Sequence, residues 1–319
     1  MHILITGAGG FVGQILAEAL LKKTDHTLLL TDVVDPPIPK GGDSARVSTT
    51  KGDLCDPSFL SSLVTSSISA AFVFHGIMSS GAEANYELGM RVNVDATRAL
   101  FEAFRATCPA SLRVIYASSQ AVYGQPLPET VTEAVVPTPG SSYGCEKMVC
   151  ELLVNDYTRR GFFTGFSLRF PTITVRPGKP TAAASSFLSG MIREPLQGVG
   201  CSIPLKDRSF PSWLCSPRTL TANLLASLAL KADALPPHKR SINLPGIRVT
   251  IQEMMDALEK VGGKEALSLL KEETVPTYEV ILRSWPQRFD NSLALGLGFV
   301  RDQEFEGAVR DFKDSLDKA

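Results

Sequence analysis

The chain contains 319 residues, of which 44% are hydrophobic and 20% are charged. This composition is too apolar and too weakly charged for a disordered chain, and the length corresponds to about two folding units of ~150 residues or one large unit. Because 32 Lys and Arg residues nearly balance 33 Asp and Glu residues, no global basic field exists to recruit nucleic acid or an acidic membrane, which favours a small-molecule partner.

The first half of the sequence alternates between short apolar runs and segments with helical periodicity. Strands that are apolar throughout and separated by helices are typical of a parallel sheet covered on both faces. The strand-like run Ile3–Ile5 and the helical segment Phe11–Leu21 form the first such pair. We therefore predict an α/β fold with a Rossmann-type, doubly wound parallel sheet. Further strands are expected at Leu28–Leu30, Ala70–Phe74, Arg113–Ala117 and Gly165–Phe170, and further helices at Leu88–Phe104 and Tyr143–Tyr157.

The character of the sequence changes after Phe170, because seven prolines fall between Pro171 and Pro217. Short strands, loops and few helices are expected in such a segment, which predicts a smaller, mixed α/β C-terminal lobe. We predict a Rossmann domain made of residues 1–170 and about 219–246, and a substrate-binding lobe made of residues 171–218 and about 247–319. The elements expected here are helices at Ala182–Ile192, Thr219–Leu230, Thr250–Val261 and Gln303–Leu316, and a strand at Ser241–Leu244.

A glycine-rich segment, Thr6–Gly13, directly follows the first expected strand and leads into a helix. Gly7 permits a tight turn, Gly10 lets the backbone approach a pyrophosphate, and Gly13 lets the helix pack against the strand. Asp32 ends the second strand, where its carboxylate can accept hydrogen bonds from the adenosine ribose and repel a 2′-phosphate. The pattern predicts binding of NAD in preference to NADP.

Tyr143 and Lys147 lie four residues apart at the start of an expected helix, so that their side chains share one face. A nearby ammonium and an oxidised nicotinamide ring both favour the phenolate, and we expect them to lower the pKa of Tyr143 from ~10 toward ~7. Ser118 and Ser119 follow the strand Arg113–Ala117, at the sheet edge where open α/β sheets place their sites. We predict that a serine hydroxyl holds the reacting oxygen while Tyr143 moves its proton.

Together these motifs resemble the extended short-chain dehydrogenase/reductases, the group that contains the sugar-nucleotide epimerases, over nearly the whole chain. Two places depart from the common pattern of that group: the turn His75–Ile77, and Ala96, where glycine is usual. Both keep small residues, so the departures do not affect the expectation of cofactor binding. The segments that carry the resemblance are Thr6–Gly13, Asp32, Asp53–Leu54, Asn93, Ala117–Gly124, Tyr143 with Lys147, Ser241–Gly246, Phe289–Asp290 and Leu297–Phe299.

The resemblance implies roles for individual residues. Lys147 would bind the nicotinamide ribose and lower the pKa of Tyr143, and Ser119 matches the catalytic hydroxyl of the family. His75 is expected to support the backbone beside the cofactor rather than to act as a base. The NAD contacts implied are Gly7, Gly10, Phe11, Val12, Gly13, Asp32, Asp53, Leu54, His75, Gly76, Asn93, Ser118, Tyr143, Lys147, Pro171 and Thr172.

The segments Arg176–Phe187 and Ile192–Leu196 resemble one branch of the family, whose members use NAD to oxidise the C2 hydroxyl of a four-carbon sugar acid, D-erythronate or a similar one, to the 2-oxo acid. An anionic substrate needs cationic partners, and the guanidinium fork of arginine suits a carboxylate. We expect Tyr143 as general base, with Ser119 and Lys147. The substrate-binding residues predicted are Ser119, Tyr143, Arg176 and Lys179, with Arg193 and Arg208 as weaker candidates.

Other functions stay open at this point. A sugar-nucleotide epimerase or dehydratase and a uronate dehydrogenase are related enzymes, and a non-enzymatic NAD-sensing regulator is an alternative of another class. A regulator has no use for the complete set of Tyr143, Lys147 and Ser119, so the sequence favours an enzyme. The exact sugar acid, its stereochemistry and the physiological direction do not follow from the sequence.

The six cysteines include no CxxC pair, so we expect reduced thiols and no metal site. Met1 and His2 lead directly into the first apolar strand without the pattern of a secretory signal. These features predict a cytoplasmic protein without membrane contact. By resemblance, a homodimer is expected to form through the helices at Val92–Phe104 and Tyr143–Tyr157.

Overall fold

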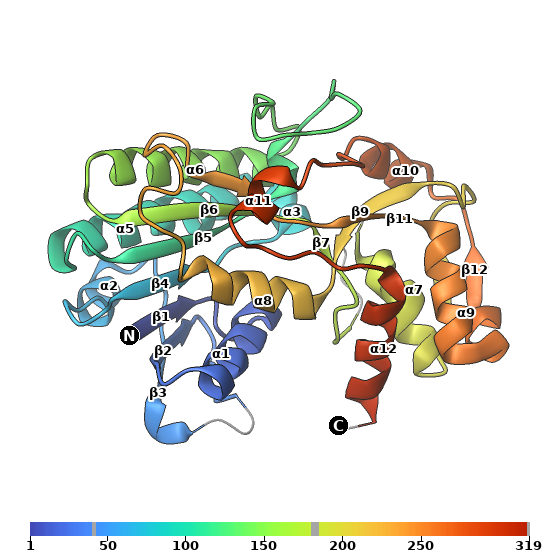
Figure 1. Cartoon of the computed structure of the whole chain (residues 1–319), viewed down its shortest axis with the longest axis horizontal. Coiled ribbons are helices and arrows are strands. Elements are labelled where there is room, and N and C mark those ends of the chain that lie inside the picture. The colour runs from blue at the N-terminus through green and yellow to red at the C-terminus, as the bar shows by residue number, and fades with distance from the viewer. Residues whose placement is uncertain (40–42, 180–184, 318–319) are drawn as a thin grey trace. The chain divides into compact units, whose positions relative to one another are not determined.

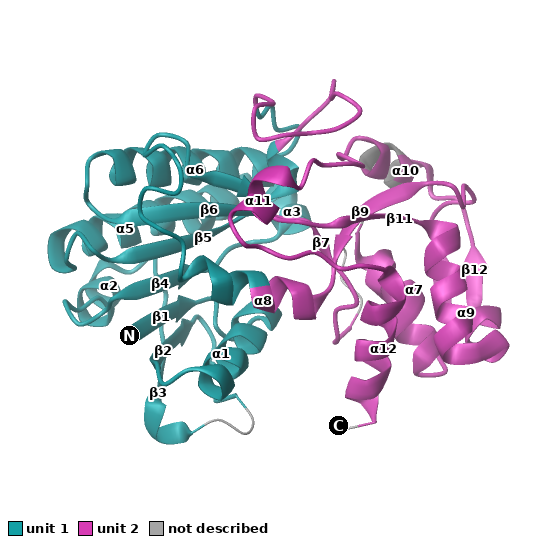
Figure 2. Ribbon diagram, viewed as in Figure 1, with its two compact units in different colours: residues 1–122, 137–169, 223–242 teal, residues 123–136, 170–222, 243–319 magenta. Residues whose placement is uncertain are grey.

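The computed structural model describes residues 1–39, 43–179 and 185–317. The chain forms two compact units whose segments are interleaved along the sequence (Figure 2). Within the described residues, no helix combines the length and the apolar character needed to cross a bilayer. Unit 1 consists of residues 1–122, 137–169 and 223–242, and unit 2 of residues 123–136, 170–222 and 243–319.

Unit 1 is built on a seven-stranded sheet in the order β10-β6-β5-β4-β1-β2-β3 (Figure 1). Strands β1 and β4 pair in parallel with each other, and each has a further parallel neighbour, β2 or β5. The predicted α/β fold with a doubly wound sheet is therefore confirmed. The strands are β1 His2–Thr6, β2 Thr27–Asp32, β3 Val47–Lys51, β4 Ala70–Val73, β5 Arg113–Ser119, β6 Thr164–Phe170 and β10 Ser241–Asn243.

Alternation along the strands distributes side chains to the two faces of this sheet. Leu4 of β1 packs with Leu100 of α5 and Val154 of α6 in one buried cluster, whereas its neighbours Ile3 and Ile5 are buried on the opposite face. Helices α2, α5 and α6 cover the first face, and α1 covers the other (Figure 1). The helices are α1 Phe11–Lys23, α2 Pro57–Leu63, α3 Ser79–Ala84, α4 Tyr86–Gly89, α5 Ala96–Thr107 and α6 Ser142–Arg159, with short 3₁₀ turns η1 Ser44–Arg46 and η3 Gln120–Val122.

The single helix predicted at Leu88–Phe104 is wrong in one respect. A π-helical segment, η2 (Met90–Asp95), separates α4 from α5. A π turn inserts residues that a 3.6-residue period does not anticipate, and such turns often occur at functional sites. Here the turn accompanies inward placement of Asn93, which is 1% exposed. Strand β3 was not predicted either, because Val47–Lys51 is an edge strand with half-exposed polar residues and no apolar run.

Unit 2 contains a mixed sheet and a bundle of helices, which confirms the predicted mixed α/β character. Strand β9 pairs antiparallel with β11 and parallel with β7, and β8 pairs in parallel with β12. Its core joins Met191 of α7, Met254 of α9 and Val309 of α12. The elements are β7 Thr172–Ile173, α7 Ser186–Leu196, β8 Cys201–Ile203, β9 Pro211–Cys215, β11 Ile247–Thr250, α9 Ile251–Ser268, β12 Leu270–Glu272, α10 Pro276–Arg283, α11 Ser292–Gly296 and α12 Phe305–Leu316; α8, Pro217–Ser227, is shared between the two units.

The predicted helix boundaries in this half are shifted by a few residues. The helix predicted at Ala182–Ile192 corresponds to α7, which ends four residues later, at Leu196, while residues 182–184 lie outside the described ranges. Helix α9 begins after a capping box, in which Thr250 and Glu253 bond reciprocally, and it continues past the predicted end. Gly263 has φ of 79°, which accommodates a kink that the hydrophobic period did not reveal.

Candidate active site

The glycine-rich turn between β1 and α1 is shaped by close backbone contacts. Gly7 has φ of 65°, and a Cβ atom there would lie 2.7 Å from the backbone nitrogen of His75. A Cβ at Gly13 would lie 2.7 Å from Cα of Ala8, so only glycine lets α1 approach the strand this closely. Within the described part of the chain, a Cβ at Gly10 would meet a backbone oxygen of Gly7 at 3.2 Å and otherwise open space. The turn at Gly7 and the close packing at Gly13 thus agree with the sequence, whereas the approach of Gly10 to a pyrophosphate stays a prediction.

The N-terminus of α1 fits a bound pyrophosphate. Its N-cap, Gly10, has no side-chain cap, and its first turn contains no acidic residue. Uncapped N–H groups and the positive end of the helix dipole together favour an anion. Phe11 and Val12 begin this helix, as predicted for residues that contribute those N–H groups.

Asp32 organises the same turn. Its Oδ2 accepts a hydrogen bond from the backbone of Gly9 at 2.9 Å, and Oδ1 accepts one from Val33 at 2.7 Å. The carboxylate is only half-buried, so it can still accept from ribose hydroxyls, and its negative charge disfavours a 2′-phosphate. The Gly9 contact was missed by sequence reasoning, which considered only Gly7, Gly10 and Gly13.

His75 follows β4, and both of its ring nitrogens are engaged. Nδ1 lies 2.8 Å from Thr6 Oγ1, and Nε2 lies 3.1 Å from Thr97 Oγ1. Burial, with a smaller contribution from Lys147, lowers the pKa of His75 to about 3. A neutral imidazole held at both nitrogens suits the predicted supporting role and not that of a general base.

The loop after β4 is held by Asn93. Its Oδ1 accepts from the backbone N–H of Ile77 at 2.7 Å, and Nδ2 donates to the carbonyl of Ile77 at 3.0 Å. A Cβ at Gly76 would lie 2.8 Å from Asn93 Oδ1 and 3.8 Å from Lys147 Nζ. The predicted cofactor residues Gly76, Asn93 and Lys147 therefore lie together in unit 1.

Asp53 and Leu54 form the turn after β3. Asp53 is exposed, and its Oδ1 accepts from the backbone of Cys55 at 2.9 Å, whereas Leu54 is buried. Their predicted adenine contact stays a prediction. A carboxylate and a small apolar surface at a strand end are compatible with it.

The start of α6 is fixed by two neighbours. Ser141 caps the helix by accepting from the backbone of Gly144 at 3.2 Å. A Cβ at Gly144 would lie 2.1 Å from the carbonyl oxygen of Ala121, so this glycine lets the first turn of α6 press against the residues that follow β5. The close approach brings Tyr143 next to Ser119.

Tyr143, Ser119 and Lys147 form one group at the end of β5. The hydroxyls of Tyr143 and Ser119 are hydrogen-bonded. Lys147 Nζ donates to the carbonyl of Ala117 at 2.9 Å and lies 5.5 Å from the centre of the Tyr143 ring. Both Tyr143 and Lys147 are buried. A phenol, a second hydroxyl and an ammonium so arranged can hold an alcohol oxygen and move its proton.

The protonation of this group differs from the expectation. Burial raises the pKa of Tyr143 to about 12, and Glu146 adds to the rise, while the bond from Ser119 opposes it. Burial lowers the pKa of Lys147 to about 8. In the protein residues taken alone, burial of the phenolate therefore holds the pKa of Tyr143 above its ordinary value. The predicted lowering also needs the charge of the oxidised nicotinamide, and it stays a prediction.

Ser118 faces away from Ser119, as alternation along a strand requires. Its Oγ donates to Glu151 at 2.5 Å, and Glu151 also receives bonds from Arg169 at 2.6 and 2.8 Å and from Ser241 at 2.7 Å. This buried network ties α6 to β6 and β10. The side chain of Ser118 is therefore engaged structurally, and only Ser119 is directed at Tyr143.

In unit 2, Arg176 is held by its backbone. Its N–H donates to Ser189 Oγ at 3.1 Å, and its carbonyl accepts from Arg193 Nη1 at 2.9 Å. Among the described residues, no hydrogen bond or ion pair engages its guanidinium, although the residue is more than half-buried. Burial, and next the charge of Arg193, lower the pKa of Arg176. A partly desolvated guanidinium without a counterion is suited to a carboxylate.

The other basic candidates differ from Arg176. Lys179 is exposed, and residues 180–184 that follow it lie outside the described ranges. Arg193 pairs with Glu194 at 2.6 Å, and Arg208 pairs with Glu272 at 2.5 Å. Pro171 is buried, and Thr172 begins β7. Their predicted contacts with cofactor or substrate stay predictions.

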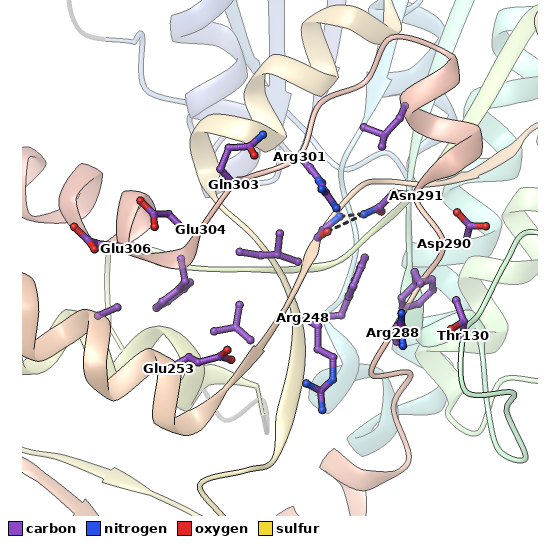
Figure 3. Close-up of a pocket in the computed structure, with 18 of the residues that line it drawn as sticks. Thr130, Arg248, Glu253, Arg288, Asp290, Asn291, Arg301, Gln303, Glu304 and Glu306 are labelled. Carbon is purple, nitrogen blue, oxygen red and sulfur yellow. Dashed lines mark hydrogen bonds between the residues drawn. The ribbon is translucent and has the colours of Figure 1, made fainter.

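Unit 2 also contains a cavity of about 950 Å³ between β11, α9, α11 and the segment before α12 (Figure 3). Its lining includes none of the residues predicted for cofactor or substrate. Arg248, Arg288 and Arg301 lie in its wall, but Glu253 and Glu304 do as well (Figure 3). Since charges of both signs line it, the cavity does not select an anion.

Comparison with known proteins shows which family the chain belongs to. Residues 3–208 match the NAD dependent epimerase/dehydratase family. A D-erythronate dehydrogenase from Cupriavidus necator is 42% identical over 324 residues, and one from Haemophilus influenzae is 41% identical over 316 residues. Each alignment covers 98% of this chain and 98% of the relative.

Solved structures show the same fold. The crystal structure of a nucleoside-diphosphate-sugar epimerase from Agrobacterium tumefaciens superimposes with a TM-score of 0.93 and 36% identity, covering 100% of this chain and 95% of the other. A GalE-like L-threonine dehydrogenase from Cupriavidus necator has a TM-score of 0.85 at 21% identity, covering 99% of this chain and 100% of the other.

The chain belongs to the NAD dependent epimerase/dehydratase family. Within that family it is an NAD-dependent dehydrogenase of the short-chain dehydrogenase/reductase type. Its cofactor is NAD.

Proposed function

We propose that the protein oxidises the C2 hydroxyl of a four-carbon sugar acid, D-erythronate or a close analogue, to the 2-oxo acid. The single observation that carries the reaction type is the hydrogen-bonded pair of Tyr143 and Ser119 beside Lys147 at the end of β5. The substrate class is supported by the two D-erythronate dehydrogenases that match 98% of the chain.

NAD would be held by the turn around Gly7 and Gly10, by Asp32 at the ribose, and by Lys147. When bound, it supplies the acceptor for the hydride that leaves C2. The oxidised nicotinamide is also positive, and its charge is the contribution that the protein residues alone do not provide toward a lower pKa of Tyr143. The predicted lowering of the Tyr143 pKa thus requires bound NAD.

The protein residues bind the C2 oxygen of the substrate and accept the proton of its hydroxyl group. Ser119 donates a hydrogen bond to the C2 oxygen, and the Tyr143 phenolate takes the hydroxyl proton as the carbon–oxygen bond gains double-bond character. Lys147 in its ammonium form stabilises that phenolate. Such proton transfer by a positioned group typically contributes ~10²–10⁴-fold to the rate.

Arg176 is the residue proposed to hold the substrate carboxylate. Its guanidinium is partly desolvated and has no counterion among the described residues, so pairing with a carboxylate would satisfy it. Ser189 and Arg193 fix its backbone and so limit where the side chain can reach. Lys179 is the second proposed cationic contact.

The test is an NADH-absorbance screen over aldonic and uronic acids of four to six carbons. We expect sustained NADH formation with a four-carbon aldonic acid and much slower formation with the longer acids. Absence of NADH with every aldonic acid would contradict the proposal. Oxidation of a six-carbon uronic acid at C1 would instead identify a uronate dehydrogenase.

A sugar-nucleotide epimerase is the second candidate, because the Agrobacterium tumefaciens structure named as a nucleoside-diphosphate-sugar epimerase is 36% identical to this chain. An epimerase recycles its NAD and releases no net NADH. Conversion of a UDP-sugar or GDP-sugar without NADH release would favour this candidate over the dehydrogenase.

We also propose a homodimer, formed through α5 and α6. Leu152 on α6 is 54% exposed and is the apolar side chain that we expect such an interface to cover. Light scattering at known concentration should give twice the chain mass, and Leu152→Glu should return the mass of one chain. A cytoplasmic location is proposed together with this assembly.

A further inference from the structure

A buried carboxylate, Glu146, lies in α6 between the two residues proposed to manage the proton. It is 1% exposed, three residues after Tyr143 and directly before Lys147. Among the described residues, Oε1 of Glu146 has no hydrogen-bond partner, and the Glu146 carboxylate forms no ion pair. An unpaired buried charge opposes folding, so its presence calls for a physical explanation.

The other oxygen of Glu146 provides a link to the cofactor side of the unit. Oε2 accepts from Asn93 Nδ2 at 2.5 Å, and Asn93 holds both backbone groups of Ile77. The chain of contacts Glu146–Asn93–Ile77 therefore joins the first turns of α6 to the loop after β4. That loop carries Gly76, whose Cβ position would be 3.8 Å from Lys147 Nζ.

The Glu146 carboxylate is also closely packed on the side of Oε1. A Cβ at Gly89 would lie 2.3 Å from Glu146 Oε1, so the end of α4 closes over the carboxylate. Water is thereby kept from Oε1, and little solvent remains to screen its charge. A charge in such a place acts on its neighbours more strongly than one at the surface.

The negative charge of Glu146 acts on both neighbours in the same direction. It raises the pKa of Tyr143, because it opposes the phenolate, and it raises the pKa of Lys147, because it favours the ammonium. The other titratable or charged groups around this turn are Cys150 and Glu151 of α6, Tyr116 of β5, His75 after β4, Glu83 of α3, and the exposed Arg91 and Asp95 of η2.

We propose that Glu146 is a positioning residue for the dehydrogenation: its carboxylate fixes the Tyr143–Lys147 turn against Asn93 and sets the pH range in which both side chains have their working protonation states. The inference rests on the proposed function and deepens it. Glu146 touches neither the reacting carbon nor the oxygen that loses its proton, and it acts through Tyr143 and Lys147.

The decisive variant is Glu146→Gln, which keeps an oxygen that can accept from Asn93 and removes the charge. We expect both limbs of the pH profile of kcat to move about one unit toward acid, since Tyr143 and Lys147 both lose the charge that raises their pKa values. Glu87→Gln, on the exposed surface of α4, is the matched control and should leave both limbs in place. A purely structural role would lower kcat without moving the limbs, and that result overturns the proposal.

A second readout needs no sugar acid. In the NAD-bound protein, ionisation of Tyr143 is followed as tyrosinate absorbance, taken as the difference from Tyr143→Phe. In Glu146→Gln the midpoint should fall by about one pH unit. An unchanged midpoint overturns the proposal, whether or not any sugar acid is oxidised. Failure of the sugar-acid screen with a shifted midpoint would overturn the proposed substrate alone.

Asn93→Ala provides a further test in case the Glu146→Gln variant does not fold. This change removes the hydrogen bond to the Glu146 carboxylate and both contacts with the backbone of Ile77. We expect NADH affinity, measured by fluorescence titration, to fall as the loop at Ile77 loses its anchor. Unchanged NADH affinity contradicts the link between Glu146 and that loop.

Discussion

Unit 1 holds its proposed functional residues through buried contacts, whereas unit 2 holds Arg176 by the backbone and, among the residues that the structure describes, leaves its guanidinium without a partner. In unit 1, Gly13 packs on Ala8 at a distance that excludes any side chain, and His75 is bonded at both ring nitrogens. In unit 2, the bonds from Ser189 and Arg193 end at the main chain of residue 176.

The difference between the two units corresponds to their two proposed tasks, which are cofactor binding in unit 1 and substrate recognition by Arg176 in unit 2. A cofactor of fixed shape is bound by a rigid surface whose groups are already in place, which limits the entropy lost on binding. A cation that recognises the substrate must stay available to pair with the substrate carboxylate. The protein therefore positions the backbone of Arg176 without neutralising its guanidinium. If this contrast is correct, changes in unit 1 should affect chemistry or stability, and changes at Arg176 should affect substrate affinity.

Tyr143→Phe should give the largest effect, because it removes the proposed proton acceptor and leaves the ring. We expect kcat to fall by about 10²–10⁴-fold with the free energy of unfolding nearly unchanged. The measurement is steady-state NADH formation. Tyr86→Phe, on an exposed tyrosine of α4, is the control, and retention of more than about a tenth of kcat in Tyr143→Phe would refute the role of Tyr143.

Gly13→Ala should destabilise unit 1 by about 3 kcal/mol, near the upper end for overpacking, since the new Cβ meets the main chain of Ala8 and not a movable side chain. Urea unfolding measures the loss. Gly140→Ala serves as the matched control, because no described residue other than its chain neighbours has an atom within 4 Å of its Cβ position. Equal stability of the two variants would show that the turn around Gly13 is not held by close packing.

Arg176→Gln should raise the KM for the sugar acid about 10–100-fold, the range for a lost charged hydrogen bond of about 1.5–3 kcal/mol. The KM for NAD should hardly change. Arg218→Gln removes a guanidinium that is 63% exposed in the same unit and should leave both constants unaltered. A rise in the KM for NAD instead would place Arg176 on the cofactor.

His75, which is half-buried, should make unit 1 sensitive to acid. Its pKa of about 3 in the folded protein lies below the usual value of 6.5, so its contribution to stability is present above pH 6.5 and is lost as pH falls toward about 3. Between about pH 7 and about pH 5 the loss should be about 2 kcal/mol. Urea unfolding of His75→Gln should show a smaller dependence on pH than the wild type, whereas the exposed His238→Gln variant should show the full dependence.

The sheet and its cofactor turn could be predicted because their signals are local. A strand, three glycines and Asp32 follow one another within the first βαβ unit, and backbone sterics connect that pattern to one structure. The edge strand Val47–Lys51 and the π-helical turn at Met90–Asp95 escaped prediction because neither follows an apolar period.

The buried polar residues were the larger omission. Glu146, Glu151 and Arg169 gave no motif signal, yet they fix α6 and the loop that follows β4. Their partners lie far along the chain and become visible only after folding. Two glutamates at a five-residue interval among the apolar residues of the first half of α6 are a weak signal that could have raised the question.

The most direct test uses a four-carbon aldonic acid carrying deuterium at C2, with mass spectrometry of the reduced cofactor. The proposed reaction predicts one deuterium in NADH for each molecule of acid oxidised, and a slower rate than with the unlabelled acid if hydride transfer limits turnover. NADH that forms without deuterium would contradict oxidation at C2, and with it the central claim about what Tyr143, Ser119 and Lys147 do.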